Sequence, residues 1–214
     1  GNLGNAYDSL GDYPKAIEYH KRCLKILQEI KNREGEGNAL GSLGIAYQAL
    51  GDNPKAIEFY ERWLKIAQEI KDRQREGQSL GSLGIAYDSM GDYPKAIEYH
   101  KRWLKIAQEI KDSRGESAAL NNLGYTYYKT GNLQLAETTL EGSIHIQESL
   151  RGGLPDNNKI TIFDTQRRTY RTLQQVLIAQ NKTDAALLIA ERGRARAFVE
   201  LLANKLSDNP NEQL

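Results

Sequence analysis

Apolar and small residues recur along this chain at the spacing of amphipathic helices. One stripe has the spacing i, i+3, i+4 and i+7, which places its members on one face of a helix: Leu80, Leu83, Gly84 and Tyr87. A second stripe comes after a turn: Ala96, His100, Trp103, Ala107 and Ile110. Two such stripes in succession predict a helix–turn–helix unit with an apolar interior.

The turn between the two stripes carries residues that end one helix and begin the next. Gly91 suits the left-handed position after a helix, and Asp92 is a good N-cap. Pro94 fits the first turn of the following helix, where its missing N–H matters little. The unit repeats every forty residues: residues 41–80 align with 81–120 without a gap, 1–40 match with small changes, and 121–150 match more loosely. We assign the repeats to residues 1–34 (truncated at its start), 37–74, 77–114 and 117–150.

The repeat resembles the tetratricopeptide repeat (TPR), in its longer variant of about forty residues. The resemblance covers residues 1 to 150. The residues that match the TPR pattern are Leu80, Leu83, Gly84, Tyr87, Gly91 and Ala96. It implies an all-α, right-handed superhelical α-solenoid with a concave groove. Trp63 and Trp103 depart from the short repeat, where a small residue is common. Their place is left open between the core that joins the repeats and the edge of the groove.

Two glycines in each first helix need a reason, since a glycine inside a helix costs about 1 kcal/mol relative to alanine. One set is predicted to lie where the two helices of a repeat approach closely: Gly4, Gly44, Gly84 and Gly124. The second set, Gly41 and Gly81, lies on a different face. The TPR resemblance implies that this face lines the groove, with bare backbone open to a ligand.

The pattern changes after residue 150. Residues 151–159 have the composition of a loop, and residues 160–206 predict a degenerate fifth repeat that covers the apolar end of the fourth. Residues 207–214 are polar and predict a flexible tail. Residues 190–203 resemble the junction between a TPR array and a CHAT domain, a caspase-like module found mainly in filamentous bacteria and cyanobacteria. That resemblance implies a bacterial chain that serves as the arm of a larger protease-like protein.

Composition limits which cellular compartments and which kinds of partner are expected. The formal net charge is +1, with 27% charged residues, which gives no reason to expect nucleic acid or a membrane as partner. Cys23 is the only cysteine and no apolar run reaches membrane-spanning length, which fits a cytoplasmic protein. The only methionine is Met90, so we expect a fragment of a longer protein that begins inside a repeat.

No pattern of catalytic or cofactor-binding residues stands out. The sequence has no phosphate-binding loop and no zinc motif, and its carboxylates recur at repeat positions, as expected of solvated faces. His20 and His100 hold equivalent positions on the core stripe and are expected to be packed and hydrogen-bonded, whereas His145 lies on an outer face. Cys23 is expected to be a buried structural thiol. We predict no enzyme activity, no cofactor and no metal for this chain.

Arginines gather in the last two predicted helices. They could form a patch for RNA or an acidic partner. The favoured alternative is a charged surface that touches a neighbouring domain, with arginine stems covering apolar area. The residues are Arg167, Arg168, Arg171, Arg192, Arg194 and Arg196.

The first helices of the repeats supply the predicted groove. Ile45, Ile85 and Tyr125 are apolar and in register but lie off the core stripe, which indicates an interaction site. Half-burial by the curvature of the superhelix is the structural alternative. Only Lys129 is basic here, so a clamp for a C-terminal carboxylate is missing, and an extended or helical peptide with small apolar anchors is expected. The predicted groove residues are Asn5, Asp8, Ile45, Gln48, Ile85, Asp88, Asn121, Tyr125, Tyr128 and Lys129.

The main hypothesis is therefore a scaffold that binds a protein or peptide partner in its groove, without chemistry of its own. One alternative is the regulatory arm of a TPR–CHAT protein, with a caspase-like domain after Leu214. Another is self-assembly into a homo-oligomer through the apolar ends of the solenoid.

Overall fold

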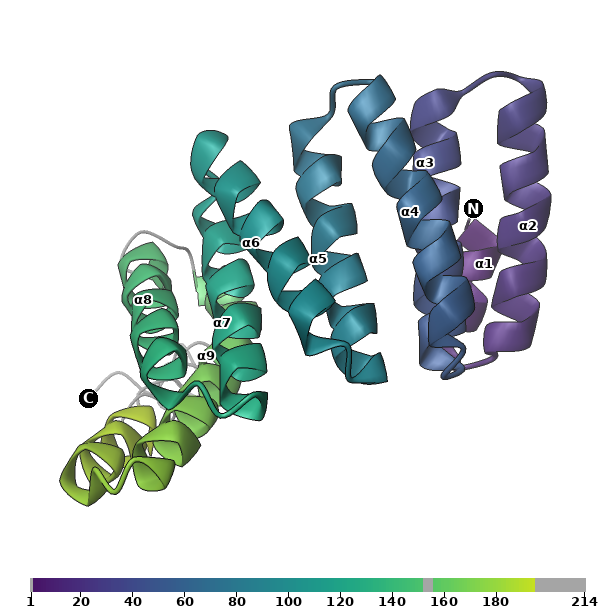
Figure 1. Cartoon of the computed structure of the whole chain (residues 1–214). Helices are drawn as coiled ribbons and strands as arrows, with labels where there is room; N and C mark the ends of the chain where they lie inside the picture. The colour runs from purple at the N-terminus through teal and green to yellow at the C-terminus, as the bar shows by residue number, and fades with distance from the viewer. Residues whose placement is uncertain (1, 152–155, 195–214) are drawn as a thin grey trace. The chain divides into compact units, whose positions relative to one another are not determined.

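Helices make up the structure, a computed structural model that describes residues 2–151 and 156–194, with side chains for residues 2–150 and 166–194 (Figure 1). In chain order the helices are α1 (Asn2–Ser9), α2 (Tyr13–Glu29), α3 (Arg33–Ala49), α4 (Asn53–Glu69), α5 (Arg73–Met90), α6 (Tyr93–Glu109), α7 (Ser113–Lys129), α8 (Leu133–Arg151) and α9 (Asp156–Ala179). A further helix begins at residue 183 and is described to residue 194. No strand occurs in this described part, which confirms the predicted all-α class.

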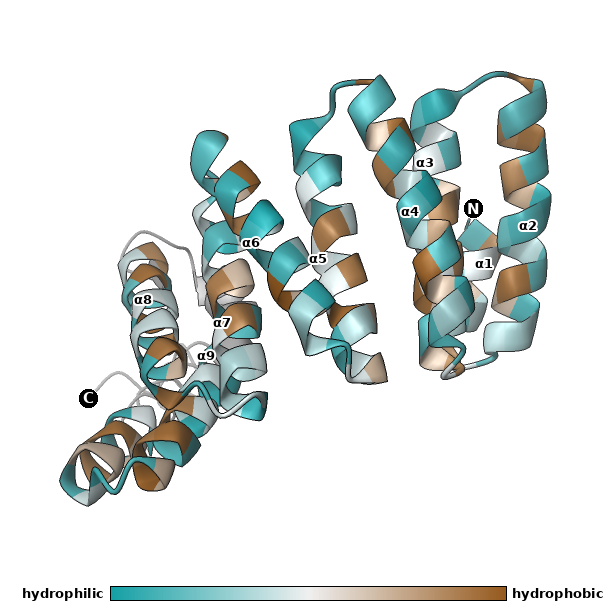
Figure 2. Cartoon of the chain, viewed as in Figure 1, coloured by the Kyte–Doolittle hydropathy of each residue, from teal (hydrophilic) through white to brown (hydrophobic). Residues whose placement is uncertain are grey.

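The helices belong to two compact units, divided between Thr126 and Tyr127. In the first unit the helices α1 to α6 each pack on the next helix along the chain, as in a repeat solenoid. Figure 2 shows apolar and polar residues alternating in short bands along these helices, which is the pattern of amphipathic helices.

The predicted turns between the two helices of a repeat are confirmed. Asp52 caps α4, and its side chain accepts a hydrogen bond from the backbone N–H of Lys55 at 3.2 Å. Asp12 and Asp92 do the same for α2 and α6. The glycines before these caps have positive φ, 81° at Gly51 for example, and so supply the left-handed residue that ends the preceding helix.

The first helices of the repeats begin about one helical turn before the assigned repeat starts. Helix α3 begins at Arg33 and α5 at Arg73, four residues before the assigned starts at 37 and 77, and α7 begins at Ser113, not at 117. These first helices are capped by the residue before them: Asn32 accepts from the N–H of Gly35, and Asp72 from the N–H of Arg75.

The turn that precedes these caps contains a lysine where glycine is usual. Lys31, Lys71 and Lys111 have φ values of 56–57°, in the left-handed region. The backbone N–H of Asn32 reaches the carbonyl of Leu27, which closes the turn as in a Schellman motif. This turn between repeats therefore forms without glycine.

The predicted loop at 151–159 is also too long. Helix α8 continues to Arg151 and α9 begins at Asp156, so residues 156–159 are helical. The predicted tail at 207–214 lies outside the described residues, as do residues 195–206 at the end of the predicted fifth repeat.

Close packing explains the first glycine set. A Cβ at Gly44 would lie 2.3 Å from Cε1 of Tyr60, and a Cβ at Gly84 would lie 2.3 Å from Cε1 of His100. Both positions are contacts between the first and second helix of one repeat. The predicted close approach of these helices is therefore confirmed.

The second glycine set does not face an open groove. A Cβ at Gly41 would lie 3.2 Å from the ring of Trp63, and a Cβ at Gly81 would lie 2.8 Å from the ring of Trp103. The indoles of the second helices cover these glycines, which are buried. The prediction of bare backbone at Gly41 and Gly81 is wrong, and the two tryptophans pack inside their own repeats.

Candidate binding surface

An apolar row is exposed on the first helices of three successive repeats. Ile45 on α3 is 55% exposed, Ile85 on α5 is 42% exposed, and Tyr125 on α7 is 39% exposed. Each is forty residues after the last, so the three occupy the same position in the repeat. All three belong to the first compact unit. We call them the inner row.

Exposed uncharged residues continue the stripe along each helix. On α3, Asn38 and Ala49 are exposed at positions i−7 and i+4 from Ile45. On α5, Gln78 and Ser89 hold the equivalent positions around Ile85. Asn38, Ala49 and Gln78 were missed in the sequence because the stripe was drawn through Gly41 and Gly81. Their helical spacing from the isoleucines was the signal that could have found them.

One predicted groove residue is buried. Asn121 is only 7% exposed, at the repeat position that Gly41 and Gly81 occupy. It therefore belongs to the interior of the repeat and not to an exposed surface. Asn5 is exposed on α1, and Lys129 is exposed and Tyr128 half-buried at the end of α7, in the second unit.

Three other predicted groove residues are held by hydrogen bonds to the second helix of their own repeat. Asp8 Oδ2 lies 2.7 Å from Nε2 of His20, and Asp88 Oδ2 lies 3.1 Å from Nε2 of His100. In the second repeat, the hydroxyl of Tyr60 donates to Oε1 of Gln48 at 2.8 Å. The acceptors Asp8, Gln48 and Asp88 thus form a polar floor of the first unit, half-buried at one repeat position.

The polar floor depends on buried partners. His20 and His100 are 2% and 0% exposed, which confirms that they are packed and hydrogen-bonded. Burial raises the pKa of Tyr60 well above its ordinary value, so its hydroxyl stays protonated and remains a donor at neutral pH. The floor residues therefore position the helices and leave the inner row as the exposed apolar part of this face.

One repeat junction has an additional bond. Thr126 on α7 donates through Oγ1 to the carboxylate of Asp88, with distances of 2.9 and 3.0 Å to its two oxygens. The equivalent residue for Asp8 is Ala46, and Oδ1 of Asp8 is buried without a hydrogen-bond partner. A buried acceptor left unsatisfied costs about 1–3 kcal/mol.

We expect Ala46→Thr to raise the free energy of unfolding by about 1 kcal/mol, because the new hydroxyl repeats the bond of Thr126 to Asp88. Ala46→Val is the matched control, since valine has the same shape without the hydroxyl. Urea unfolding followed by circular dichroism measures both. A threonine variant no more stable than the valine variant would show that no bond to Asp8 forms.

The described arginines of the predicted patch, Arg167, Arg168, Arg171, Arg192 and Arg194, are all exposed. Arg192 pairs with Glu148, with Nη2 at 2.5 Å from Oε2, and Tyr170 donates to the same carboxylate at 2.7 Å. Arg196 lies outside the described residues. At least one of the six arginines therefore holds α8 and the last described helix together.

The other singled-out side chains are less informative. Cys23 is half-exposed, so the prediction of a fully buried thiol is wrong. His145 is exposed on α8, as predicted. Within residues 2–150 and 166–194, the acidic, histidine and cysteine side chains form no group of three that could hold a metal ion. None of the described helices is both long and apolar enough to cross a membrane.

Comparison with known proteins identifies the class. The Tetratricopeptide repeat family model matches residues 1–69, 36–109 and 75–149, so the chain belongs to the tetratricopeptide repeat family. Tetratricopeptide repeat protein 28 of Mus musculus and of Homo sapiens are each 38% identical over 80 residues, which is 36% of this chain. That match spans only 3% of the length of either relative.

Solved structures share the fold at low sequence identity. BtubC (BKLC) from P. vanneervenii has a TM-score of 0.79 at 22% identity, over 92% of this chain and 78% of its own. A putative kinesin light chain of Podosopora anserina with nearly identical TPR-like repeats has a TM-score of 0.72 at 22% identity, over 91% of each chain. A Rap protein complexed with Competence and Sporulation Factor has a TM-score of 0.74 at 16% identity, over 92% of this chain and 52% of its own. These likenesses establish the repeat-solenoid fold.

Proposed function

We propose that this chain is a protein-interaction scaffold that binds an uncharged, apolar segment of a partner protein across its inner row. The observation that carries the proposal is the exposure of Ile45, Ile85 and Tyr125 at one repeat position of the first unit. Large apolar side chains exposed in register on a folded surface mark interaction sites.

The uncharged residues on the helices beside Ile45 and Ile85 favour an uncharged ligand. The chain has 27% charged residues, yet the exposed neighbours of Ile45 and Ile85 on their own helices, Asn38, Ala49, Gln78 and Ser89, are uncharged. Two charges lie close by: Arg75 donates to Asn38 at 3.0 Å, and Lys129 holds the equivalent position after Tyr125. Burying a charged ligand side chain against such residues would remove its water without offering an opposite charge. An uncharged segment with apolar anchors avoids that cost, and the amide and hydroxyl groups can bond to its backbone.

Membership of the TPR family supports a binding role, since the repeats build an extended, preformed surface. Two proteins of similar fold have structures as complexes: the Rap protein with Competence and Sporulation Factor, and the Rap conjugation gene regulator of the plasmid pLS20 with the Phr* peptide. We therefore include both short peptides and segments of larger proteins among the expected ligands. We also propose that the repeats are the forty-residue variant of the TPR.

The test uses peptides displayed on phage, selected on the 214-residue chain. The enriched peptides are expected to be rich in apolar residues and poor in charged ones. They should lose binding by at least tenfold on the variant Ile45→Lys, Ile85→Lys, Tyr125→Lys, because each lysine places a charge in an apolar contact.

The matched control is Ile70→Lys, Ile110→Lys. It alters exposed isoleucines at the C-terminal ends of the second helices α4 and α6, away from the inner row. Circular dichroism first establishes that both variants remain helical. Equal binding by the parent and the inner-row variant, or selection of strongly charged peptides, would overturn the proposal.

Two finer proposals concern the context of the chain. In the first, the chain is attached to a caspase-like domain and acts as its regulatory arm in a bacterial cytoplasm. This proposal rests on residues 190–203, of which 195–203 lie outside the described residues. Expressing the natural full-length protein and testing whether inner-row peptides alter its protease activity would decide this. Self-assembly through the ends of the array is the other, and sedimentation equilibrium over a concentration series would test it, since a mass that stays at 24.1 kDa would contradict it.

A further inference from the structure

The last pair of described helices, α9 and the helix at residues 183–194, carries an exposed arginine at a position that is buried in the pairs before it. This position lies ten residues before the left-handed turn residue, which is Gly131 between α7 and α8 and Asn181 in the last pair. In the last pair it holds Arg171, which is exposed. Arg171 therefore does not share the packing of its counterparts. These counterparts are all buried: Gly41, Gly81 and Asn121.

The residue that faces this position has changed as well. In the pair formed by α5 and α6, the ring of Trp103 covers Gly81, where a Cβ would lie 2.8 Å from the ring. Trp103 stands twelve residues after the turn residue of its pair, and the same count from Asn181 leads to Gly193. A glycine cannot cover the first helix as an indole does, so the side chain of Arg171 remains open to a ligand.

Arg171 and Arg194 lie beside the contact between the two helices of the last pair. A Cβ at Gly193 would lie 3.5 Å from Cβ of Tyr170, and each arginine directly follows one of these two residues. Because successive Cα atoms are about 3.8 Å apart, one short segment can reach both guanidinium groups. Within the described residues neither arginine forms a side-chain ion pair, so both are available to an anionic group.

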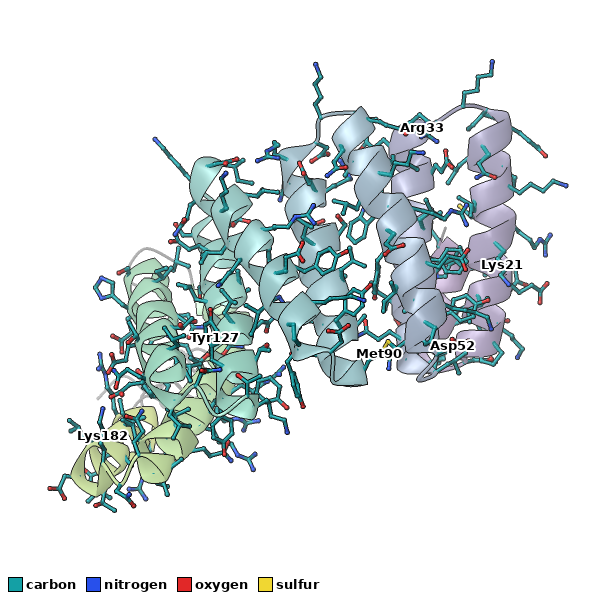
Figure 3. The ribbon with its side chains drawn as sticks, viewed as in Figure 1. Lys21, Arg33, Asp52, Met90, Tyr127 and Lys182 are labelled. Carbon is teal, nitrogen blue, oxygen red and sulfur yellow. The ribbon has the colours of Figure 1, made fainter. Side chains whose placement is uncertain are left out.

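Most of the charge in this pair is basic. Residues 166–194 contain six basic and two acidic side chains. Lys182, which Figure 3 labels in the turn between the two helices, is matched by Glu137 of α8 at 2.6 Å. Arg192 is matched by Glu148 of α8 at 2.5 Å. The other four bases are exposed arginines: Arg167, Arg168, Arg171 and Arg194.

The acids of the same two helices are fewer near these arginines. Glu191 stands three residues before Arg194, and Asp164 stands three residues before Arg167. Asp184 lies at the start of the last helix, ten residues from Arg194 and so about 15 Å away. Two nearby acids against four arginines leave this end of the pair positive, which favours an anionic partner.

Two exposed apolar side chains extend the surface toward the turn. Ile178, seven residues after Arg171 on α9, is 53% exposed, and Leu187, seven residues before Arg194 on the last helix, is 57% exposed. Seven residues make about two turns, so each apolar residue shares a helix face with its arginine at a distance of about 10 Å. We call Arg171, Arg194, Ile178 and Leu187 the arginine face.

A protein segment fits the arginine face better than a nucleic acid does. Tyr170 is the only aromatic residue between 166 and 194 and is 5% exposed, so a base would find no ring to stack on. The guanidinium fork of an arginine binds a carboxylate through two parallel hydrogen bonds. Ile178 and Leu187 would stay in water beside a phosphate chain, whereas apolar side chains of a protein would cover them.

We propose that the arginine face binds an acidic segment of a partner protein that carries apolar side chains beside its carboxylates. The carboxylates pair with Arg171 and Arg194, and apolar side chains about 10 Å further along cover Ile178 and Leu187. This spacing corresponds to about three residues of an extended segment or about seven of a helix. The inner row belongs to the first compact unit and the arginine face to the second.

The experiment measures the fluorescence anisotropy of a labelled peptide added to the 214-residue chain. In this probe, serines set glutamates and leucines about 10 Å apart. We expect saturable binding below about 1 mM, weakened at least tenfold when glutamines replace the glutamates or serines replace the leucines. Added salt should also weaken binding, because it screens charge pairs at an exposed surface.

Variants of the chain then locate the binding. Arg171→Gln with Arg194→Gln should weaken binding of the probe by at least tenfold. Lys25→Gln with Lys65→Gln is the matched control, since it removes the same charge from exposed lysines of the first unit. Arg171→Lys with Arg194→Lys keeps the charge without the fork and should give an intermediate loss. Circular dichroism is recorded for all variants.

Each outcome decides the proposal. Lack of saturable binding below about 1 mM contradicts it. An equal loss in the lysine control also contradicts it, because net charge alone would then explain the binding. Displacement of the probe by a short oligouridine at a lower concentration than by unlabelled peptide would assign the face to nucleic acid. Inner-row peptides are recognised by their loss on the inner-row variant, so the proposed function and the arginine face can fail independently.

Discussion

Gly44→Ala is expected to lower the free energy of unfolding by about 2 kcal/mol. The added Cβ would lie 2.3 Å from Cε1 of Tyr60, a distance at which helix α4 or the Tyr60 ring must move. Overpacking of this kind costs about 1–3 kcal/mol or more. Alanine recovers about 1 kcal/mol through its better helix propensity, which offsets only part of the strain. Urea unfolding followed by far-ultraviolet circular dichroism measures the difference.

Gly193→Ala is the control for helix propensity. A Cβ at Gly193 would meet the side chain of Tyr170 at 3.5 Å, which is ordinary contact. This variant is expected to raise stability by about 0.5–1 kcal/mol, because it gains propensity without strain. If Gly44→Ala behaved in the same way, the close approach of α3 and α4 would be refuted, and with it the reason for the repeated glycine.

Asp88→Ala is expected to cost about 3 kcal/mol, the second large effect. Asp88 accepts hydrogen bonds from His100 and from Thr126, both of which are 0% exposed. Removing the carboxylate leaves the buried His100 nitrogen without its acceptor, at about 1–3 kcal/mol, and also removes the bond from Thr126, whose Oγ1 keeps the carbonyl of Asn122 at 2.9 Å as acceptor. Thermal and urea unfolding of the variant measure the loss, and circular dichroism checks that the helices remain.

The chain offers a graded control for Asp88. Gln48→Ala, at the same repeat position, strands one donor, the Tyr60 hydroxyl, and is expected to cost about 1–2 kcal/mol. Glu98→Ala removes only an exposed pair with Arg102 and should change stability very little. A cost that did not follow the order Asp88, Gln48, Glu98 would show that the floor bonds do not hold the repeats together.

These two predictions concern the frame on which the binding surface is built. The polar floor fixes the angle between the first and second helix of each repeat, because its bonds join residues twelve apart in the sequence. The inner row stands on the exposed side of the same first helices. A loosened floor is therefore expected to weaken ligand binding as well, through loss of a preformed surface.

The pattern of apolar residues determined the class of fold by itself. The period of forty residues, the two stripes in each unit and the capping turn at Gly91, Asp92 and Pro94 predict paired helices stacked in a solenoid, and the helices have this form. The glycine at 44 and 84 could be interpreted correctly as well, because a small residue repeated within a helix has few other physical reasons.

Only the tertiary structure decided which side of the first helices is covered. Helical spacing tells which residues share a face, but not which of two neighbouring faces another helix packs against. Gly41 and Gly81 therefore were predicted to be open, while the rings of Trp63 and Trp103 cover them. The prediction that Ile45 and Ile85 of the inner row are exposed agrees with the structure.

The bonds of the polar floor also came from the structure alone. The sequence shows that aspartate accompanies histidine, and glutamine accompanies tyrosine, at positions twelve apart. Nothing local joins such residues, because they stand on different helices and meet only when the turn brings the helices together. Local pattern thus determined the elements and their period, while the contacts between elements, which depend on three-dimensional packing, decided what is buried, what is bonded and what remains exposed for a partner.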